Sequence, residues 1–250
     1  MSRPVLLDNV AHADLRVAIG YAASFGDAIN ECAVFPNEFD DLQREYPILF
    51  RKDANGAFYA VVLLGLDRDE NLFLDTAGWH ARHVPALRQR GPFLIGMVER
   101  DTHHEPMIYV DLDSPRIGAE GGQAVFLPHG GQAPYLDHVV RVLQVIHDGQ
   151  IQRDAMFAAL VAADLIAPVA LDISLDETTR YTVPGCYTIA TERLAQLDGA
   201  TLAALNAAGF LRHAFLVASS LGNVARLIDL KNRRRRAEAG EAVPVTPVAA

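Results

Sequence analysis

The triplet His12-Ala13-Asp14 combines residue types that bind iron. Two histidines and one carboxylate form the facial triad of non-haem iron oxygenases. A distal histidine such as His129 or His138 would complete a triad and make the chain a metal-dependent oxygenase. The sequence places only two of the three ligands, and the HExxH pattern of zinc hydrolases is absent. An Fe site at His12, Asp14 and His129 is therefore the alternative hypothesis, and most of the nine histidines are interpreted as solvated or packing residues.

Nucleophile motifs do not favour an enzyme either. The GxSxG pattern is absent, and Ser219 and Ser220 lie in an apolar segment, where packing is the common role. Cys186 follows a Pro-Gly pair with no base beside it, so we interpret it as an inert thiol. Neither Cys186 nor Cys32 belongs to a CxxC pair, which argues against a thiolate zinc site. A single disulfide between the two cysteines is compatible with the sequence. The leading expectation is a protein with no catalytic site and no cofactor.

Charge and apolar runs limit the partners and the compartment. The formal net charge is −9 over 250 residues. The last twenty residues carry +3, five basic against two acidic side chains, so the preceding 230 residues carry −12. An acidic body repels phosphate backbones, so we expect no nucleic-acid partner. No apolar run has the length of a signal-peptide core or of a membrane span, which predicts a cytoplasmic protein without a span.

Alternating and β-branched runs predict an antiparallel sheet in the N-terminal part. Pro47 to Leu66 reads as a hairpin, in which Asp53-Ala54-Asn55-Gly56 supplies the turn. Further strands are predicted at Phe93 to Val98 and Met107 to Leu112. Residues 113–134 are rich in glycine and proline and are expected to form a seam.

Helical periodicity dominates the C-terminal part. Helices are predicted at Tyr135 to Ile146, Gln150 to Asp164 and Phe210 to Leu230, and two strands at Val169 to Leu175 and Tyr181 to Ile189. The expected fold is α+β, with a sheet-rich half (1–112) packed with a mostly helical half (135–232) in a single domain, 1–232. Residues 233–250 are expected to be a basic and then disordered tail, in which the run Arg233 to Arg236 is a solvated helix end.

The order and spacing of several segments resemble the SapC family of bacterial proteins. The resemblance covers nearly all of residues 9–232 and rests on six segments, none of which is a chemical fingerprint by itself. They are FPNEFDDLQREYPILF (Phe35 to Phe50), LLGLDRDENLFLD (Leu63 to Asp75), VPALRQRGPF (Val84 to Phe93), DLDSPRI (Asp111 to Ile117), GCYTIATERLAQLDGATLAALNAAGFL (Gly185 to Leu211) and ASSLGNVARLIDLKN (Ala218 to Asn232).

The resemblance implies an accessory role rather than a reaction. The family is named for its association with surface-layer proteins, and many members of the similar subgroup are encoded beside TonB-dependent receptors, tryptophan halogenases and cupin-like oxygenases. It implies no catalytic residues, and the histidines at 80, 103, 104 and 129 lie outside the pattern. A structural component of the surface layer is the third hypothesis, against which the missing signal peptide argues.

The leading hypothesis is a non-catalytic accessory or binding protein that serves an uptake or peptide-modification system. Its partners would be the halogenase, the cupin-like enzyme or the receptor encoded nearby. We expect a ligand to bind in the seam between the two halves, because such clefts are the usual binding sites. Polar and aromatic residues in or near the matched segments are the candidate ligand-binding residues: Glu45, Tyr46, Trp79, Arg88 and Arg90.

Overall fold

The computed structural model describes residues 4–100, 103–118 and 121–240. These residues group into two compact units, each built from separated stretches of the chain. The first unit comprises the described residues of Met1–Asp27, Ala33–Glu38 and Leu74–Ala155, and the second those of Ala28–Cys32, Phe39–Phe73 and Met156–Ala250. Neither unit is a continuous half of the chain, and residues 113–134 lie within the first unit.

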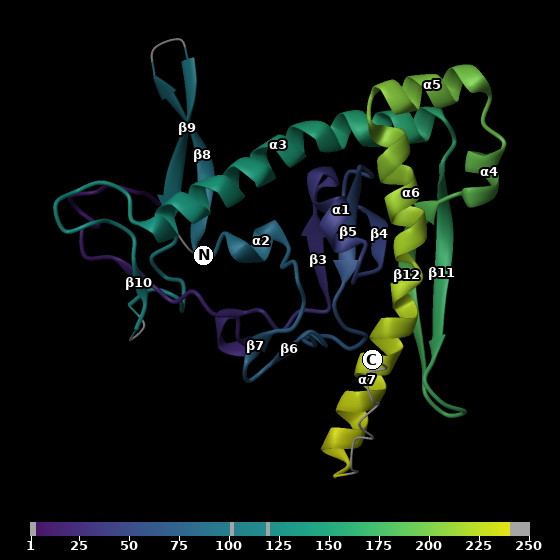
Figure 1. Cartoon of the computed structure of the whole chain (residues 1–250), viewed down its shortest axis with the longest axis horizontal. Helices are drawn as coiled ribbons and strands as arrows, with labels where there is room; N and C mark the ends of the chain where they lie inside the picture. Colours follow the sequence, from purple (N-terminus) through teal and green to yellow (C-terminus); the bar gives the residue numbers. More distant parts are fainter. Residues whose placement is uncertain (1–3, 101–102, 119–120, 241–250) are drawn as a thin grey trace, which may run out of the picture. The chain divides into compact units, whose positions relative to one another are not determined.

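A long antiparallel hairpin forms the main strand pair of the first unit. Strands β8 (Phe93–Arg100) and β9 (His103–Val110) pair along their whole length, as Figure 1 shows, which confirms the strands predicted around these residues. Strand β1 (Val5–Leu6) pairs with β9 at its outer edge. Two shorter antiparallel ladders join β2 (Arg16–Val17) with β10 (Gln123–Ala124), and β6 (Leu74–Asp75) with β7 (Gly78–Trp79).

The apolar core of the first unit gathers residues from these strands and from helix α3 (Pro134–Ala162). The helix contributes Leu136, Val139, Leu143 and Ile146, which recur at the predicted three- and four-residue spacing. The strands contribute residues such as Val17 (β2), Phe93 (β8) and Val110 (β9). Shorter helices of this unit are η1 (Ala23–Phe25), η2 (Pro36–Glu38) and α2 (Ala86–Gln89).

Helix α3 is one continuous helix of 29 residues, where the sequence predicted two. The two predicted helices, Tyr135 to Ile146 and Gln150 to Asp164, leave Gly149 between them, and glycine in a helix interior costs about 1 kcal/mol relative to alanine. The structure gives this glycine another role. A Cβ atom at Gly149 would lie 2.4 Å from the Cβ of Phe35, so the missing side chain allows a close approach of the two segments.

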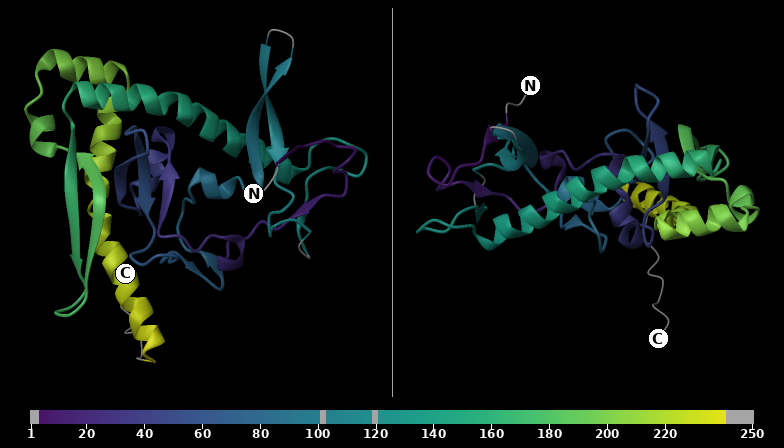
Figure 2. Two further views of the ribbon diagram at one scale, coloured as in Figure 1. Left: turned by 180° about the vertical axis from the view of Figure 1, so that it is seen from behind. Right: turned by 90° about the horizontal axis from the view of Figure 1, so that it is seen from above.

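A five-stranded sheet with the order β11-β12-β4-β5-β3 organises the second unit. Its centre is the predicted hairpin, β4 (Ile48–Lys52) and β5 (Phe58–Leu63), in which the Asp53 carboxylate accepts hydrogen bonds from the backbone N–H groups of Asn55 and Ala57. Figure 2 shows the other predicted pair, β11 (Ile166–Ser174) and β12 (Arg180–Ile189), lying side by side. Strand β3 (Glu31–Val34) is the edge strand.

Helix α6 (Phe210–Ser220) packs against β12 and β4 of this sheet. The buried hydroxyl oxygen of Ser220 accepts a hydrogen bond from the N–H of Ile48, the first residue of β4, at 2.9 Å. The other helices of the unit are α1 (Phe39–Leu42), α4 (Thr191–Ala195), α5 (Gly199–Ala207) and α7 (Asn223–Glu238).

The C-terminal helices correct two predictions. The single helix expected over Phe210 to Leu230 is two helices, α6 and α7, with a break at Leu221 and Gly222. Helix α7 extends to Glu238, so the basic run Arg233 to Arg236 is the helix end that was predicted, and the helix continues beyond the expected start of the tail at residue 233. Its arginines are held by specific contacts, such as the 2.7 Å ion pair of Arg235 with Asp176. The disorder expected for residues 241–250 falls outside the described residues.

Within the described part of the chain, no single helix has both the length and the apolar composition needed to cross a bilayer. One pair of helices meets both criteria when taken together, Gly199–Ala207 with Phe210–Glu238, across a bend of 95°.

Candidate ligand-binding cavity

Two of the five predicted ligand residues belong to the framework of the second unit. Tyr46 is fully buried, and its ring centroid lies 4.6 Å from that of Phe73. Glu45 is also buried and forms an ion pair with Arg226 at 3.0 Å. Glu45 thus connects the turn after α1 to α7, and Tyr46 packs in the apolar core, so both have structural roles.

The other three predicted residues lie in the first unit and point to different places. Arg88 and Arg90 are two residues apart at the end of α2 and line different cavities. Arg90 donates from Nη1 to the Phe93 carbonyl at 2.7 Å and lines a cavity of about 450 Å³ with mostly apolar walls. Trp79 lines neither cavity, but its ring contacts Tyr21 edge-on at 5.6 Å between centroids.

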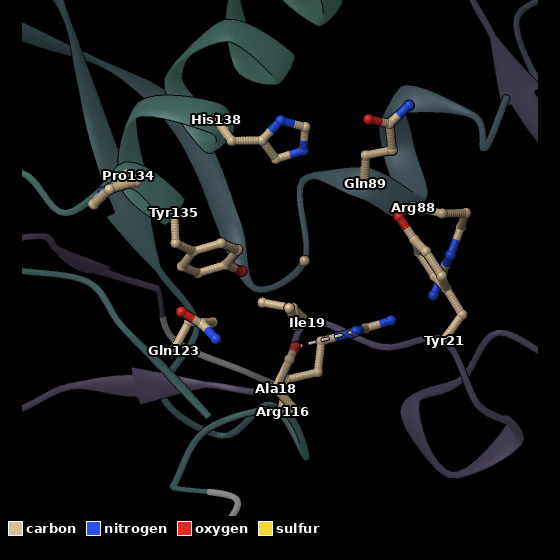
Figure 3. Close-up of a pocket in the computed structure, with 11 residues that line it drawn as sticks. Ala18, Ile19, Tyr21, Arg88, Gln89, Arg116, Gln123, Pro134, Tyr135 and His138 are labelled. Atoms are coloured by element: carbon tan, nitrogen blue, oxygen red, sulfur yellow. Dashed lines mark hydrogen bonds between the residues drawn. The ribbon is translucent and has the colours of Figure 1, made fainter. Parts of the chain in front are cut away.

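The cavity that contains Arg88 is lined by polar groups from separated segments of the first unit. It has a volume of about 490 Å³, within the range of small-molecule sites. We call it the Arg116 cavity, and Figure 3 shows His138 and Tyr135 extending from the first turns of α3 toward the space that Tyr21 borders from the other side. Its lining residues are Ala18, Ile19, Tyr21, Arg88, Gln89, Gly91, Arg116, Gln123, Pro134, Tyr135 and His138.

A buried carboxylate holds the two arginines of the Arg116 cavity in place. Asp27 has no exposed surface, and its Oδ1 accepts hydrogen bonds from Nε and Nη2 of Arg88 at 3.1 and 2.8 Å. Its Oδ2 accepts from Nη2 of Arg116 at 2.7 Å and from the Ala22 N–H at 3.0 Å. Such charge-assisted hydrogen bonds are stronger than neutral ones. The pocket floor is therefore a preorganised group of two cations and one anion.

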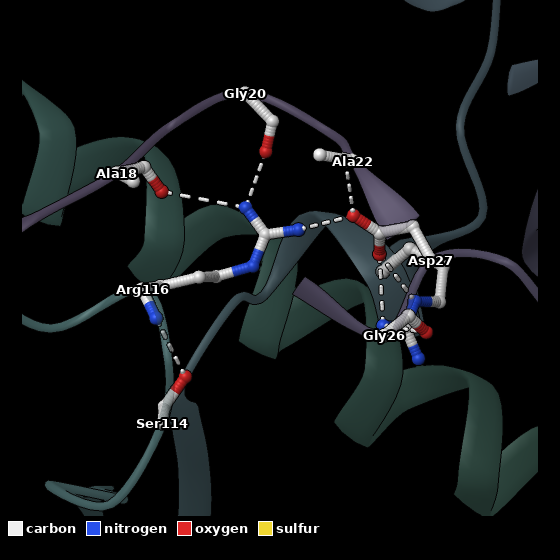
Figure 4. Close-up of polar contacts among 8 residues, drawn as sticks. Ala18, Gly20, Ala22, Gly26, Asp27, Ser114 and Arg116 are labelled. Atoms are coloured by element: carbon white, nitrogen blue, oxygen red, sulfur yellow. Dashed lines mark hydrogen bonds and ion pairs between the residues drawn. The ribbon is translucent and has the colours of Figure 1, made fainter. Parts of the chain in front are cut away.

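Arg116 is held by backbone and aromatic groups as well as by Asp27. Figure 4 shows its guanidinium donating to the carbonyls of Ala18 and Gly20 on one side and to Asp27 on the other. The guanidinium also lies 4.6 Å from the ring centroid of Phe25, at cation–π distance. Only 5 % of Arg116 is exposed, so its orientation is fixed before any ligand arrives.

Two phenols stay protonated beside these cations. Burial raises the pKa of Tyr135 to about 12, although the nearby positive charge of Arg116 acts in the opposite direction. Burial likewise raises the pKa of Tyr21 above its usual value. A phenol with a raised pKa is a hydrogen-bond donor throughout the neutral range. The cavity therefore presents mainly donors to a ligand.

The candidate iron ligands show no shared site. The Nδ1 atom of His12 accepts a hydrogen bond from the Asp8 N–H at 3.1 Å, in an exposed turn. Asp14 and His129 are exposed. Among residues 4–100, 103–118 and 121–240, no three or more His, Cys, Asp or Glu side chains are grouped so that they would hold a metal ion.

The two cysteines are both buried, and no disulfide joins them. Cys32 lies on β3 and Cys186 on β12, which are separated by β4 and β5 in the sheet. Three strand spacings amount to about 14 Å, well beyond the span of a disulfide. Burial raises the pKa of the Cys186 thiol, in keeping with the inert role predicted for it.

Sequence reasoning found Arg88 but missed the groups around it. Arg116 lies in the DLDSPRI segment used for the family resemblance, yet nothing in that segment indicates that its guanidinium is buried. Asp27 follows a glycine in a stretch without a recognised motif, and the sequence indicates only that Tyr135 begins a helix. The stretch 113–134 does contribute to the cavity, through Arg116, Gln123 and Pro134.

Comparison with known proteins places the chain in a family without assigning an activity. The SapC family model matches residues 7–227, and therefore both units. No curated protein and no solved structure matched the chain. Because the family model covers most of the sequence, the chain belongs to the SapC family.

Proposed function

We propose that this SapC-family chain is a non-catalytic binding protein that takes a small polar ligand in the Arg116 cavity. The observation that carries the proposal is the preorganised Asp27–Arg88–Arg116 group at a cavity of small-molecule size. Buried charges in such a group cost solvation energy, and folding alone is often served equally well by apolar residues of the same volume. Ligand binding would explain why Asp27, Arg88 and Arg116 are present at the cavity.

The chemistry of the lining supports binding rather than proton transfer. Guanidinium groups remain protonated at any pH at which a protein is folded. The phenol of Tyr135, with its pKa of about 12, does not act as a base near neutral pH. Gln89 and Gln123 add neutral amides that both donate and accept hydrogen bonds. These groups are suited to orient a ligand and to select it by its polar atoms.

A ligand screen with two matched variants tests the proposal. Small polar compounds that are neutral, anionic or cationic are tested by thermal shift, and hits are measured by calorimetry. Ile19→Trp places a large ring at the cavity, whereas Val10→Trp makes a similar change at a residue that is 82 % exposed and outside it. We expect hits to lose affinity by tenfold or more in Ile19→Trp and to keep it in Val10→Trp. The proposal is wrong if no compound of any charge class binds, or if both variants bind equally well.

The accessory role is a separate proposal that rests on the family resemblance. In this view the ligand-loaded chain acts beside a halogenase, a cupin-like enzyme or a TonB-dependent receptor encoded nearby. Purified full-length chain would be tested for complex formation with each of these proteins by size-exclusion chromatography, with and without a hit from the screen. Failure to form a complex with all three would refute the accessory role and leave the binding proposal intact.

A further inference from the structure

The group formed by Asp27, Arg88 and Arg116 contains two positive charges and one negative charge. Every ion pair of Arg88 and Arg116 among the described residues goes to the same carboxylate, Asp27. One carboxylate balances one guanidinium, so the group carries a net charge of +1. A cavity with this floor attracts anions and repels cations.

Arg88 retains hydrogen-bonding capacity for a ligand. Its Nε donates to Asp27, and its Nη2 donates both to Asp27 and to the Gly26 carbonyl. Its Nη1 makes no hydrogen bond to any described residue, and a guanidinium has five N–H donors, two of them on that nitrogen. The side chain is a quarter exposed and lines the cavity, whereas Arg116 is almost fully enclosed. Arg88 is thus the cation that a ligand would contact.

The walls above this floor suit an organic body rather than a bare inorganic ion. Ile19, Pro134 and the rings of Tyr21 and Tyr135 provide apolar surface around the cavity. The protonated phenols add donors that stabilise a negatively charged oxygen. Figure 3 shows the phenol end of Tyr135 turned toward the space above Arg116.

We infer that the ligand of the Arg116 cavity is a small organic carboxylate with an apolar or aromatic body. A planar guanidinium matches the geometry of a carboxylate, and one negative charge neutralises the excess charge of the group. The inference rests on the proposed function and narrows it to a ligand class. Arg88 binds the carboxylate and Tyr135 donates to it, while Asp27 positions Arg88 and Arg116 adds a second positive charge beside Asp27.

Three probes of the same shape and different charge test this inference: benzoate, benzamide and benzamidine. Calorimetry on the full-length chain is expected to show that benzoate binds at least about tenfold more tightly than the neutral and cationic probes. Added salt should weaken benzoate binding and leave benzamide binding nearly unchanged. The inference is overturned if benzamide or benzamidine binds as tightly as benzoate, or if benzoate does not bind at millimolar concentration.

Variants locate the effect at Arg88. Arg88→Gln should reduce benzoate affinity to that of benzamide, while Arg141→Gln, at an exposed residue outside the cavity on α3, should leave it unchanged. Tyr135→Phe leaves the charged group intact, so it tests the phenol even if Arg88→Gln folds poorly. It should weaken the binding of benzoate but not that of benzamide.

If neutral or cationic compounds bind in the cavity and carboxylates do not, the ligand class is wrong and the binding function stands. If nothing binds, the function itself is wrong.

Discussion

Replacing Asp27 with asparagine is expected to destabilise the first unit by about 3–5 kcal/mol. The carboxylate is fully buried and accepts hydrogen bonds of 2.7–3.1 Å from the Ala22 N–H and from the guanidinium groups of Arg88 and Arg116. Asparagine has the same shape but is neutral, keeps a single acceptor oxygen and turns an NH₂ donor toward one of the arginines. Arg116, only 5 % exposed, would then be a buried cation without a counter-ion.

The single tryptophan of the chain offers a direct readout of this unit. Trp79 lies in the first unit, and its ring is 5.6 Å from that of Tyr21, which lines the cavity beside Arg116. Urea unfolding followed by its fluorescence would give the free energy of unfolding for the parent chain and for Asp27→Asn. Asp14→Asn is the control, because Asp14 is exposed in the same unit and should change stability by less than about 0.5 kcal/mol.

The stability losses of Asp27→Asn and Arg88→Gln together test whether Asp27 compensates the buried charge of Arg116. Arg88→Gln should cost less than Asp27→Asn, because Asp27 keeps Arg116 as its counter-ion and Arg88 is partly exposed. A loss below about 1 kcal/mol for Asp27→Asn, the level of an exposed ion pair, would refute the idea that the carboxylate compensates a buried charge. So would an Arg88→Gln variant as unstable as Asp27→Asn.

Two further predictions concern the second unit. Ser220→Ala removes the acceptor for the first N–H of β4 and should lower the free energy of unfolding in urea by about 1–3 kcal/mol. Ser219→Ala, at the exposed neighbour, should lower it by less than about 0.5 kcal/mol. Equal losses would contradict the role of the Ile48–Ser220 hydrogen bond. Burial lowers the pKa of His213 below the usual 6.5, and its buried Nδ1 has no hydrogen-bond partner among the described residues. The stability that neutral His213 contributes is therefore present above pH 6.5 and lost as the pH falls through its lowered pKa. His213→Phe should flatten the acid-side decrease of the urea midpoint, and an unchanged pH profile would contradict the prediction.

Local patterns predicted the fold well where one element contains its own signals. The hairpin predicted over Pro47 to Leu66 is present as β4 and β5, because strand residues flank a turn in which Gly56 takes a positive φ. Strand β11 was predicted from the alternating pattern of Val169 to Leu175, with Tyr181 to Ile189 as its partner. The two helices predicted over α3 are one, and its Gly149 is explained by a close contact with Phe35, a residue distant in the sequence.

The candidate site was much harder to predict, because its members are far apart in the sequence. Arg88 was selected for its residue type within a matched segment, and the structure places it at a cavity. Its carboxylate partner, Asp27, lies 61 residues away, and Arg116 lies 89 residues from Asp27. No periodicity or spacing rule connects residues at such distances. Burial of the charged groups, which gives them their interest, is a property of tertiary structure alone.

The division of the chain into interleaved stretches affects how it must be made and studied. The chain passes from one unit to the other five times, so no single cut releases an intact unit. Strand β4 near residue 50 pairs with β12 at Tyr187, across more than half the chain. During synthesis β4 therefore leaves the ribosome long before β12, the strand with which it pairs. Contacts between residues so far apart in the sequence slow folding. Fragments that end at residue 112 or 155 would expose unpaired strand edges, which favour aggregation.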